Sequence, residues 1–174
     1  TFGGISGLKT ELLAGSIYDA ATGNTAFSTL DLADFEGIVG QLPEFPGIRP
    51  SWYVHKTGYA ASMMRLINAQ GGSTSAELMA GPRREFLGFP VVFTQKLNKT
   101  LTAQTEVILL YFGDLMMGTL LGNRRGIFVL VSPHRYMELN QIGILGVQRF
   151  DINVHSTGTA TDAGAVLGLK TPAS

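Results

Sequence analysis

The clearest structural pattern in this sequence is the run Arg149-Phe150-Asp151-Ile152-Asn153-Val154-His155. Polar and apolar residues alternate through it without a break, and this period of two places successive side chains on opposite faces of a β-strand. The run predicts a strand over residues 141–155, with one face on a hydrophobic core and the other in water. A half-buried sheet is the simplest interpretation.

The segments on either side of this strand extend the β pattern. Gly122-Asn123-Arg124-Arg125-Gly126 predicts a turn, and the apolar run after it predicts a strand over residues 126–132. Pro133 is expected to end that strand, because proline has no N–H to donate to a sheet. Residues 165–169 predict a short closing strand. Residues 113–122 fit either a short helix or an irregular loop.

A first helix is predicted upstream, from Ser28 to the residue before Pro43. Ser28 or Thr29 offers an N-cap, and Asp31 and Asp34 fall in the first turn, where the helix dipole favours negative charge. The apolar stripe of this helix recurs at helical spacing and consists of Leu32, Phe35, Val39 and Leu42.

A second helix is predicted over residues 56–69, with Thr57 as its cap. Its apolar stripe, which indicates core packing, consists of Tyr59, Met63, Leu66 and Ile67. Residues 70–75 are rich in Gly, Ser and Thr and have no apolar residue to hold them, so an exposed loop is expected there.

Three short strands accompany the helices. Trp52-Tyr53-Val54 predicts one, and the continuous apolar runs over residues 88–94 and 105–112 predict central strands buried on both faces. Two helices interleaved with strands and followed by strands alone predict an α+β fold. In that fold a helix-covered central sheet precedes a mainly β extension.

Composition narrows the classes of function. Apolar residues make up 45% of the chain and charged residues 15%. The charged share is low for a free monomer, which indicates a surface partly covered by neighbours. The 13 basic and 13 acidic residues cancel, so no general field attracts nucleic acid. There is no cysteine. The longest strictly apolar run, residues 107–112, is far too short for a membrane helix. Because the chain begins at Thr1, further sequence is expected upstream.

No catalytic or metal-binding pattern is present in the sequence. His55, His134 and His155 stand far apart, without the paired-histidine spacing of a zinc site. The serine nucleophile turn G-x-S-x-G is absent. Asp31 and Asp34 are explained by helix capping. We therefore expect no enzyme activity, no cofactor and no metal.

The order of these pieces along the chain carries a resemblance. They are Gly88-Phe89-Pro90-Val91-Val92, Gly113-Asp114, the Arg-Arg-Gly turn, Asn140-Gln141-Ile142 through Arg149-Phe150-Asp151, and Val166-Leu167-Gly168-Leu169-Lys170-Thr171. This order resembles the C-terminal part of the major capsid proteins of tailed bacteriophages, the Hong Kong 97-like shell fold. The resemblance covers the chain from about Gly7 to its end, without the family's N-terminal arm, extended loop and spine helix.

The resemblance implies a mechanical function. Residues 1–122 are similar to the axial domain near the capsomer centre, and residues 123–174 to the C-terminal strands of the peripheral domain. The implied protein is a self-assembling subunit of an icosahedral phage or prophage capsid, which forms capsomer rings and encloses viral DNA without sequence-specific binding. It would be found in the virion, and in the bacterial host cytoplasm during assembly. A scaffold protein or maturation protease is a further expected partner, and this chain alone is expected to be a monomer or small ring.

Three places are expected to make subunit contacts. The family places a loop near the capsomer axis at about residues 70–80, here including Gln70, Gly71, Gly72 and Ser73, although a solvated loop without special function competes with this interpretation. The guanidinium groups of Arg124 and Arg125 suit bidentate contacts with carboxylate or phosphate, and we favour contacts within or between subunits.

The third place is Asn140. It resembles the asparagine that one family member joins covalently to a lysine. Val147 stands where the assisting glutamate would be, and valine cannot move a proton. We therefore expect no such cross-link in this protein.

Two alternatives remain at the level of sequence. A bacterial nanocompartment shell protein, which is encapsulin-like and has the same fold, would enclose cargo enzymes instead of DNA. A small enzyme whose site assembles only in three dimensions would show a deep pocket with convergent polar groups.

Overall fold

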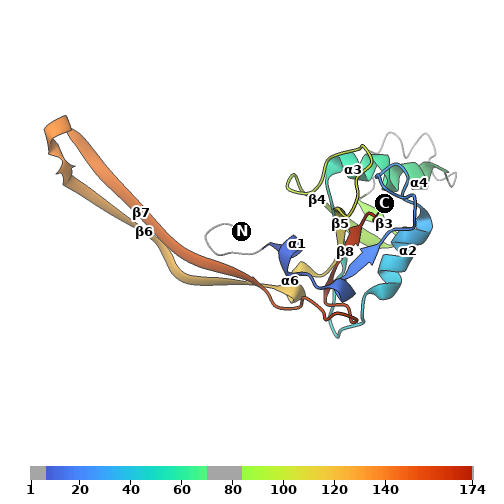
Figure 1. Cartoon of the computed structure of the whole chain (residues 1–174). Coiled ribbons are helices and arrows are strands. Elements are labelled where there is room, and N and C mark those ends of the chain that lie inside the picture. Colours follow the sequence, from blue (N-terminus) through green and yellow to red (C-terminus); the bar gives the residue numbers. More distant parts are fainter. Residues whose placement is uncertain (1–6, 70–83, 174) are drawn as a thin grey trace.

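The structure is a computed structural model that describes residues 7–69 and 84–173. Over these residues the chain forms a body built on one mixed sheet and a long two-stranded ribbon that projects from that body (Figure 1). The strands of the sheet are, in spatial order, β1 (Ile17–Asp19), β8 (Val166–Lys170), β5 (Ile108–Gly113), β2 (Ser51–Val54), β4 (Phe89–Phe93) and β3 (Glu85–Phe86). The ribbon consists of β6 (Thr119–Tyr136) and β7 (Gln141–Val154).

The helices of the body are short, and most of them lie between its strands in the sequence. In chain order they are α1 (Leu8–Glu11), the 3-10 turn η1 (Ala14–Ser16), α2 (Leu32–Gln41), α3 (Lys56–Ala61), α4 (Met63–Ala69) and α6 (Leu115–Gly118), and the 3-10 turn η2 (Met137–Leu139) lies at the far end of the ribbon. The expected α+β composition is therefore present in the body, and the expected β extension is the ribbon.

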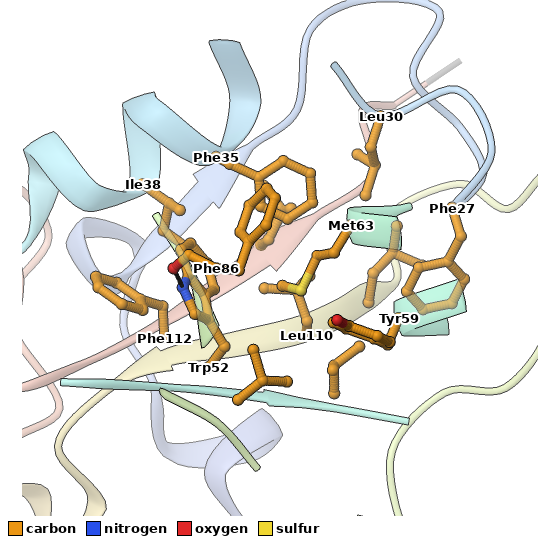
Figure 2. Packing of buried hydrophobic residues seen from close by; sticks show 14 of the residues in the cluster. Phe27, Leu30, Phe35, Ile38, Trp52, Tyr59, Met63, Phe86, Leu110 and Phe112 are labelled. Carbon is orange, nitrogen blue, oxygen red and sulfur yellow. Dashed lines mark hydrogen bonds between the residues drawn. The ribbon is translucent and has the colours of Figure 1, made fainter. Parts of the chain in front are cut away.

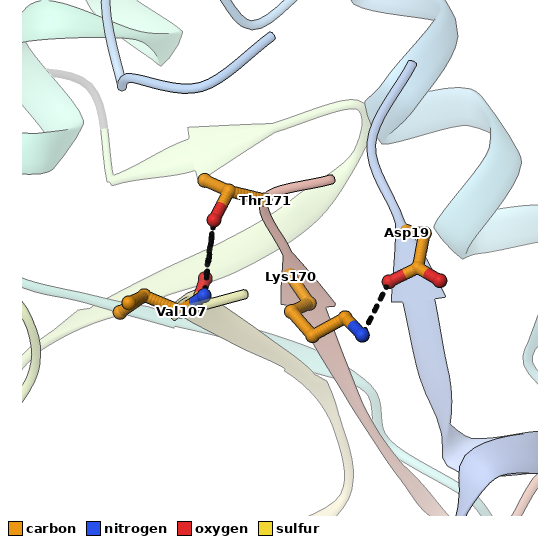
Figure 3. A network of polar contacts seen from close by, with 4 residues as sticks. All are labelled: Asp19, Val107, Lys170 and Thr171. Carbon is orange, nitrogen blue, oxygen red and sulfur yellow. Dashed lines mark hydrogen bonds and ion pairs between the residues drawn. The ribbon is translucent and has the colours of Figure 1, made fainter. Parts of the chain in front are cut away.

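The last strand, β8, lies inside the body sheet. It pairs in parallel with β1 and antiparallel with β5, so it closes the sheet between the beginning and the middle of the chain. Beyond it, the Thr171 hydroxyl accepts from the N–H of Val107 at 3.0 Å, and Lys170 forms an ion pair with Asp19 at 3.1 Å (Figure 3). β8 therefore belongs to the body sheet, because it pairs with distant strands and not with the ribbon.

Alternation along the strands divides the buried side chains between the two faces of the sheet. In β2, Trp52 and Val54 join the main cluster with the helices, while Tyr53 packs in a second cluster on the opposite face around Tyr111 and Val166. Burial raises the pKa of the Tyr111 hydroxyl above its ordinary value. Six of the sixteen buried residues of the main cluster are aromatic, and Figure 2 shows their rings packed among aliphatic side chains.

The two central strands differ from one another in burial. As predicted, β5 is covered on both faces, and its residues are buried from Leu109 to Gly113. The same prediction is wrong for β4, where Phe89 and Phe93 are half-buried and Val92 is exposed. The reason is its position, because only the two-residue strand β3 covers β4 on its outer edge.

Helix α2 begins later than predicted. Its N-cap is Asp31, not Ser28 or Thr29, and the Thr29 hydroxyl instead accepts from the N–H of Ala26 at 3.1 Å. Asp34, in the first turn as predicted, is buried and accepts three hydrogen bonds, from the N–H groups of Ala21 and Asp31 and from the Asn24 amide. These donors compensate the burial of the carboxylate and join the loop of residues 21–31 to the helix.

The second predicted helix is broken into α3 and α4 at Ser62. This residue departs from helical geometry, with φ −110° and ψ −77°, and its hydroxyl donates to the carbonyl oxygen of Gly58 at 2.7 Å. The cap is His55, whose Nδ1 accepts from the N–H of Thr57, so the predicted Thr57 cap is wrong by two residues. The predicted apolar stripe does pack on the core.

Candidate functional site

The ribbon begins at a fixed base. The side chain of Asp114 caps α6 by accepting from the N–H groups of Met116 and Met117, and it also accepts from the N–H of Arg49 at 3.0 Å. On the return strand, the N–H of His155 donates to the carbonyl oxygen of Gly118 at 3.1 Å. The ambiguity at residues 113–122 is resolved as a short helix, α6, that continues directly into β6.

Gly113 allows the close approach that this base requires. Its φ is +134°, and a Cβ at this position would overlap the carbonyl oxygen of Ala165 at the start of β8. Gly113→Ala is expected to lower the free energy of unfolding by about 3 kcal/mol, because the substitution adds both backbone strain and a clash with rigid main chain. Urea unfolding followed by circular dichroism measures this change.

Gly40 provides the matched control for that substitution. It lies in α2, and a Cβ there would meet nothing within 4 Å. Gly40→Ala is expected to raise the free energy of unfolding by about 0.5 to 1 kcal/mol, because alanine is the better helix former. Equal stability of Gly113→Ala and wild type would show that the sheet and the base of the ribbon tolerate a shift between β5 and β8.

One face of the outer ribbon, which is residues 128–131 of β6 and residues 144–147 of β7, is apolar across both strands. Phe128 lies opposite Val147, and Leu130 lies opposite Leu145. Because side chains alternate along each strand, these four residues project from the same side. Phe128, Leu130 and Leu145 are exposed and Val147 is half-buried. A continuous apolar surface of this kind on a folded chain indicates a place where another protein segment packs.

The opposite face of the outer ribbon is also apolar. Val129 lies opposite Gly146, and Val131 opposite Ile144, one step along from the pairs on the first face. Val129, Val131 and Ile144 are all more than half exposed. For a strand that is apolar on one face only, a single covering layer is enough to bury its apolar side chains. The outer ribbon requires cover on both faces.

The alternating run at residues 149–155 does not meet a core within this chain. Val154 is buried at the base, but Phe150 is 50% and Ile152 is 40% exposed. The strand itself was predicted, and the expectation that one face is buried is wrong for the isolated chain. The pattern is still that of a strand with one covered face, and the described residues leave that face partly exposed.

The predicted turn at residues 122–126 is wrong, because these residues continue β6. Asn123 lies opposite Phe150 and Arg125 opposite Arg149, which leaves Arg124 as an extra residue, and a second shift follows before Phe128. These are β-bulges, which bend a strand and redirect its side chains. The glycines on either side of the arginines predicted a turn, but glycine within a strand also marks bulges.

Pro133 does not end β6 as predicted. It lies within the strand, in the irregular stretch between the pairs Ser132–Gly143 and Tyr136–Gln141, where three residues of β6 face one residue of β7. Proline is tolerated at such a bulge because no ladder hydrogen bond is required of it.

The other predicted contact residues lie in two places. Asn140 is exposed at the tip of the ribbon, between η2 and β7, with a left-handed φ of 52°. Its position at the most distant point of the ribbon from the body is compatible with a contact. Gln70, Gly71, Gly72 and Ser73 lie outside the described residues.

The described residues contain no cluster of three or more His, Asp or Glu side chains that could hold a metal ion. No helix among them is long and apolar enough to cross a membrane. His55 caps α3 and contacts the Gln95 side chain at 3.1 Å, whereas His134 is exposed in β6 and His155 is exposed just after the end of β7. The histidines are therefore not brought together.

An apolar cavity of about 300 Å³ lies between α2, α4 and the β3–β4 turn. It is lined by Leu32, Leu66, Ile67, Glu85, Phe86, Leu87 and Gly88. Glu85 is the one titratable residue among the described residues that line this cavity.

Comparison with known proteins finds the same fold in solved capsid structures. The model of the phage capsid family matches residues 17–158. Among solved structures, the capsid of an empty GTA particle, computed with C5 symmetry, matches with a TM-score of 0.72 and 20% identity, over 97% of this chain and 57% of that chain. The capsid of a native GTA particle matches with a TM-score of 0.71 and 17% identity, over 97% of this chain and 56% of that one. No curated protein gives a significant match.

These matches confirm the expected fold and extend over both the body and the ribbon. The chain spans a little over half the length of the solved capsid chains, and the matched region contains β1 through β7. The family match covers most of the sequence, and it includes the bulged arginines and the apolar ribbon. This chain therefore belongs to the phage capsid family.

Proposed function

We propose that this chain is the shell-forming part of a capsid subunit, and that the ribbon of residues 119–154 is the arm through which subunits hold one another. The observation that carries the proposal is the pair of apolar faces on the outer ribbon, which nothing in the described chain covers. A closed shell built from many copies of one chain supplies such cover by repeating the same contact.

The body and the ribbon have different parts in this proposal. The body, with its closed sheet and aromatic core, is the axial unit around the capsomer centre. The ribbon belongs to the peripheral unit, so the boundary lies at each end of the ribbon and β8 counts with the body. The hydrogen bonds that Asp114 accepts and the tight fit at Gly113 hold the direction in which the ribbon leaves the body.

The charge of the chain bears on what the shell encloses. With equal numbers of acidic and basic residues, the chain has no general attraction for DNA, so a packaged genome would be enclosed without sequence-specific contacts. A scaffold protein or maturation protease would act on the assembling particle. We place the finished subunit in the virion and its assembly in the cytoplasm of the bacterial host.

Negative-stain electron microscopy of the intact protein tests this function. The protein is expressed alone and together with the products of any neighbouring scaffold or protease genes. Closed shells of uniform size are expected. DNA-free shells that carry an enzyme would instead favour a nanocompartment. A soluble monomer under every condition would contradict the shell function.

A further inference from the structure

The arginines at the middle of the ribbon form a cluster of like charges. Arg125 lies directly opposite Arg149 in the register of β6 and β7, and like charges at such cross-strand positions destabilise a sheet. Arg124 lines a surface hollow together with Arg149 and Asp151. The one ion pair among the described residues joins Lys170 and Asp19 in the body, so no carboxylate lies within ion-pair distance of these three guanidinium groups.

The backbone around the cluster is held in place. With its amide nitrogen turned toward the bulge, Asn123 donates to the carbonyl oxygens of Arg125 at 2.8 Å and of Arg149 at 3.2 Å. The guanidinium group of Arg125 lies over the Phe128 ring, 4.9 Å from its centroid. A bulge fixed by a side chain, with one arginine packed on an aromatic ring, presents its donors in a set direction.

Charge is distributed unevenly between the ribbon and the rest of the chain. The ribbon carries four basic residues, Arg124, Arg125, Arg135 and Arg149, against Glu138 and Asp151, a formal charge of +2. Because the whole chain has 13 of each sign, the remainder has nine basic and eleven acidic residues, a formal charge of −2. A ribbon from one copy is therefore electrostatically complementary to the body of another.

Exposed carboxylates are available on the body. Glu36 projects from the solvent side of α2, and Glu44 lies in the loop after that helix. Neither forms an ion pair within the described residues. The planar guanidinium fork matches a carboxylate bidentately, and it is less strongly hydrated than an ammonium group, which favours its use in interfaces.

Nucleic-acid phosphate suits the cluster less well. The cluster is bounded by apolar residues on both strands, Phe128 and Phe150 among them, and not by a basic track along which a DNA backbone could run.

We propose that Arg124, Arg125 and Arg149 bind carboxylates on the body of a neighbouring copy of this chain, and that this contact sets the position at which the apolar ribbon packs. The inference rests on the proposed function, because it names the partner and the chemistry of the ribbon. It adds Arg149 to the arginine pair recognised in the sequence, and it explains why like charges are kept opposite one another.

Charge removal in the intact protein tests the contact. The triple variant Arg124→Gln, Arg125→Gln, Arg149→Gln is compared with wild type by sedimentation velocity and electron microscopy across a series of salt concentrations. Self-association of the variant is expected to be at least about tenfold weaker at low salt, and to lose the salt dependence shown by wild type. A triple Arg→Lys variant, which keeps charge without the fork, is expected to fall between the two.

Two further variants separate a specific contact from general charge effects. Removing three exposed cations of the body, in Arg84→Gln, Lys96→Gln, Lys99→Gln, is expected to leave self-association unchanged. In the second variant, glutamate replaces the three ribbon arginines, and the body carries Glu36→Arg and Glu44→Arg. This exchange of charges is expected to restore part of the association.

The outcomes distinguish the contact from the function. If wild type assembles and the glutamine variant assembles equally well, the arginine contact is wrong and the shell function stands. If the variant assembles normally but loses binding to a fluorescent DNA duplex, measured by anisotropy, the cluster serves nucleic acid instead. A wild type that stays monomeric at every concentration overturns both proposals. Unchanged thermal unfolding by circular dichroism confirms that each variant is folded.

Discussion

Replacing Leu130 and Leu145 with threonine is expected to raise the protein concentration needed for assembly about a hundredfold. The two side chains lie directly opposite one another on the outer ribbon and are 48% and 57% exposed. Burying one such side chain stabilises an interface by about 1.5 to 3 kcal/mol, and each 1.4 kcal/mol is about a factor of ten in affinity. Threonine keeps the strand preference of the position, so the ribbon itself should persist.

Sedimentation velocity of the intact protein, read with electron microscopy of the same samples, measures this change. The pair Val131→Thr and Ile144→Thr alters the opposite face and is expected to weaken assembly as well, because both faces require cover. Met116→Thr is the control, since this apolar residue is 92% exposed at the base and lies outside the ribbon. Assembly at the wild-type concentration by the Leu130 and Leu145 variant would show that this face stays in solvent.

Thermal unfolding of the body should be the same in all these variants. The ribbon residues they change pack on one another and not on the aromatic core. Loss of assembly with an unchanged unfolding temperature would therefore locate the effect at the interface between subunits and not in the fold.

The second large effect is expected in the core, from Trp52→Ala. Trp52 is fully buried, and its ring centroid lies 4.1 Å from that of Phe112 and 5.6 Å from that of Phe35. Its Nε1 donates to the carbonyl oxygen of Phe86 at 2.9 Å. Truncation leaves a cavity and an unpaired carbonyl group, which together should cost about 4 to 6 kcal/mol. A domain of ordinary stability, about 5 to 15 kcal/mol, then retains little folded protein.

Urea unfolding followed by tryptophan-independent circular dichroism measures the loss, together with the yield of soluble protein. Trp52→Phe keeps an aromatic ring and should recover part of the stability. Val92→Ala, on the exposed side of β4, should change the free energy of unfolding by no more than about 0.5 kcal/mol. A Trp52→Ala protein as stable as wild type would mean that the aromatic cluster is not the centre of the fold.

The spacing of apolar residues along the chain was sufficient to predict much of the secondary structure of the body. The apolar stripe that includes Phe35 predicted α2, and the continuous apolar run at residues 105–112 predicted a central strand, because both patterns act within a few residues of chain. The starting points were less predictable. Asp31, not Ser28, caps α2 because the loop before the helix is tied to buried Asp34 from residues ten or more positions away.

The candidate site was predicted in part. Arg124, Arg125 and the alternating strand at 149–155 were recognised as important from sequence, but the turn predicted around the arginines is a pair of bulges. Whether glycine and arginine make a turn or a bulge depends on the opposite strand, and the pairing of Arg125 with Arg149 joins residues 24 positions apart. No local signal contains that pairing.

The sequence by itself determined most of the helical and extended segments, and it contained the alternation that is typical of a strand with one covered face. Tertiary structure decided where each strand lies. Only the folded chain places β8 between β1 and β5, and only the folded chain leaves the apolar faces of Leu130 and Ile144 without cover. The physical reason is that secondary structure follows from side-chain spacing along the chain, whereas burial depends on which distant segment, or which neighbouring copy, supplies the opposing surface.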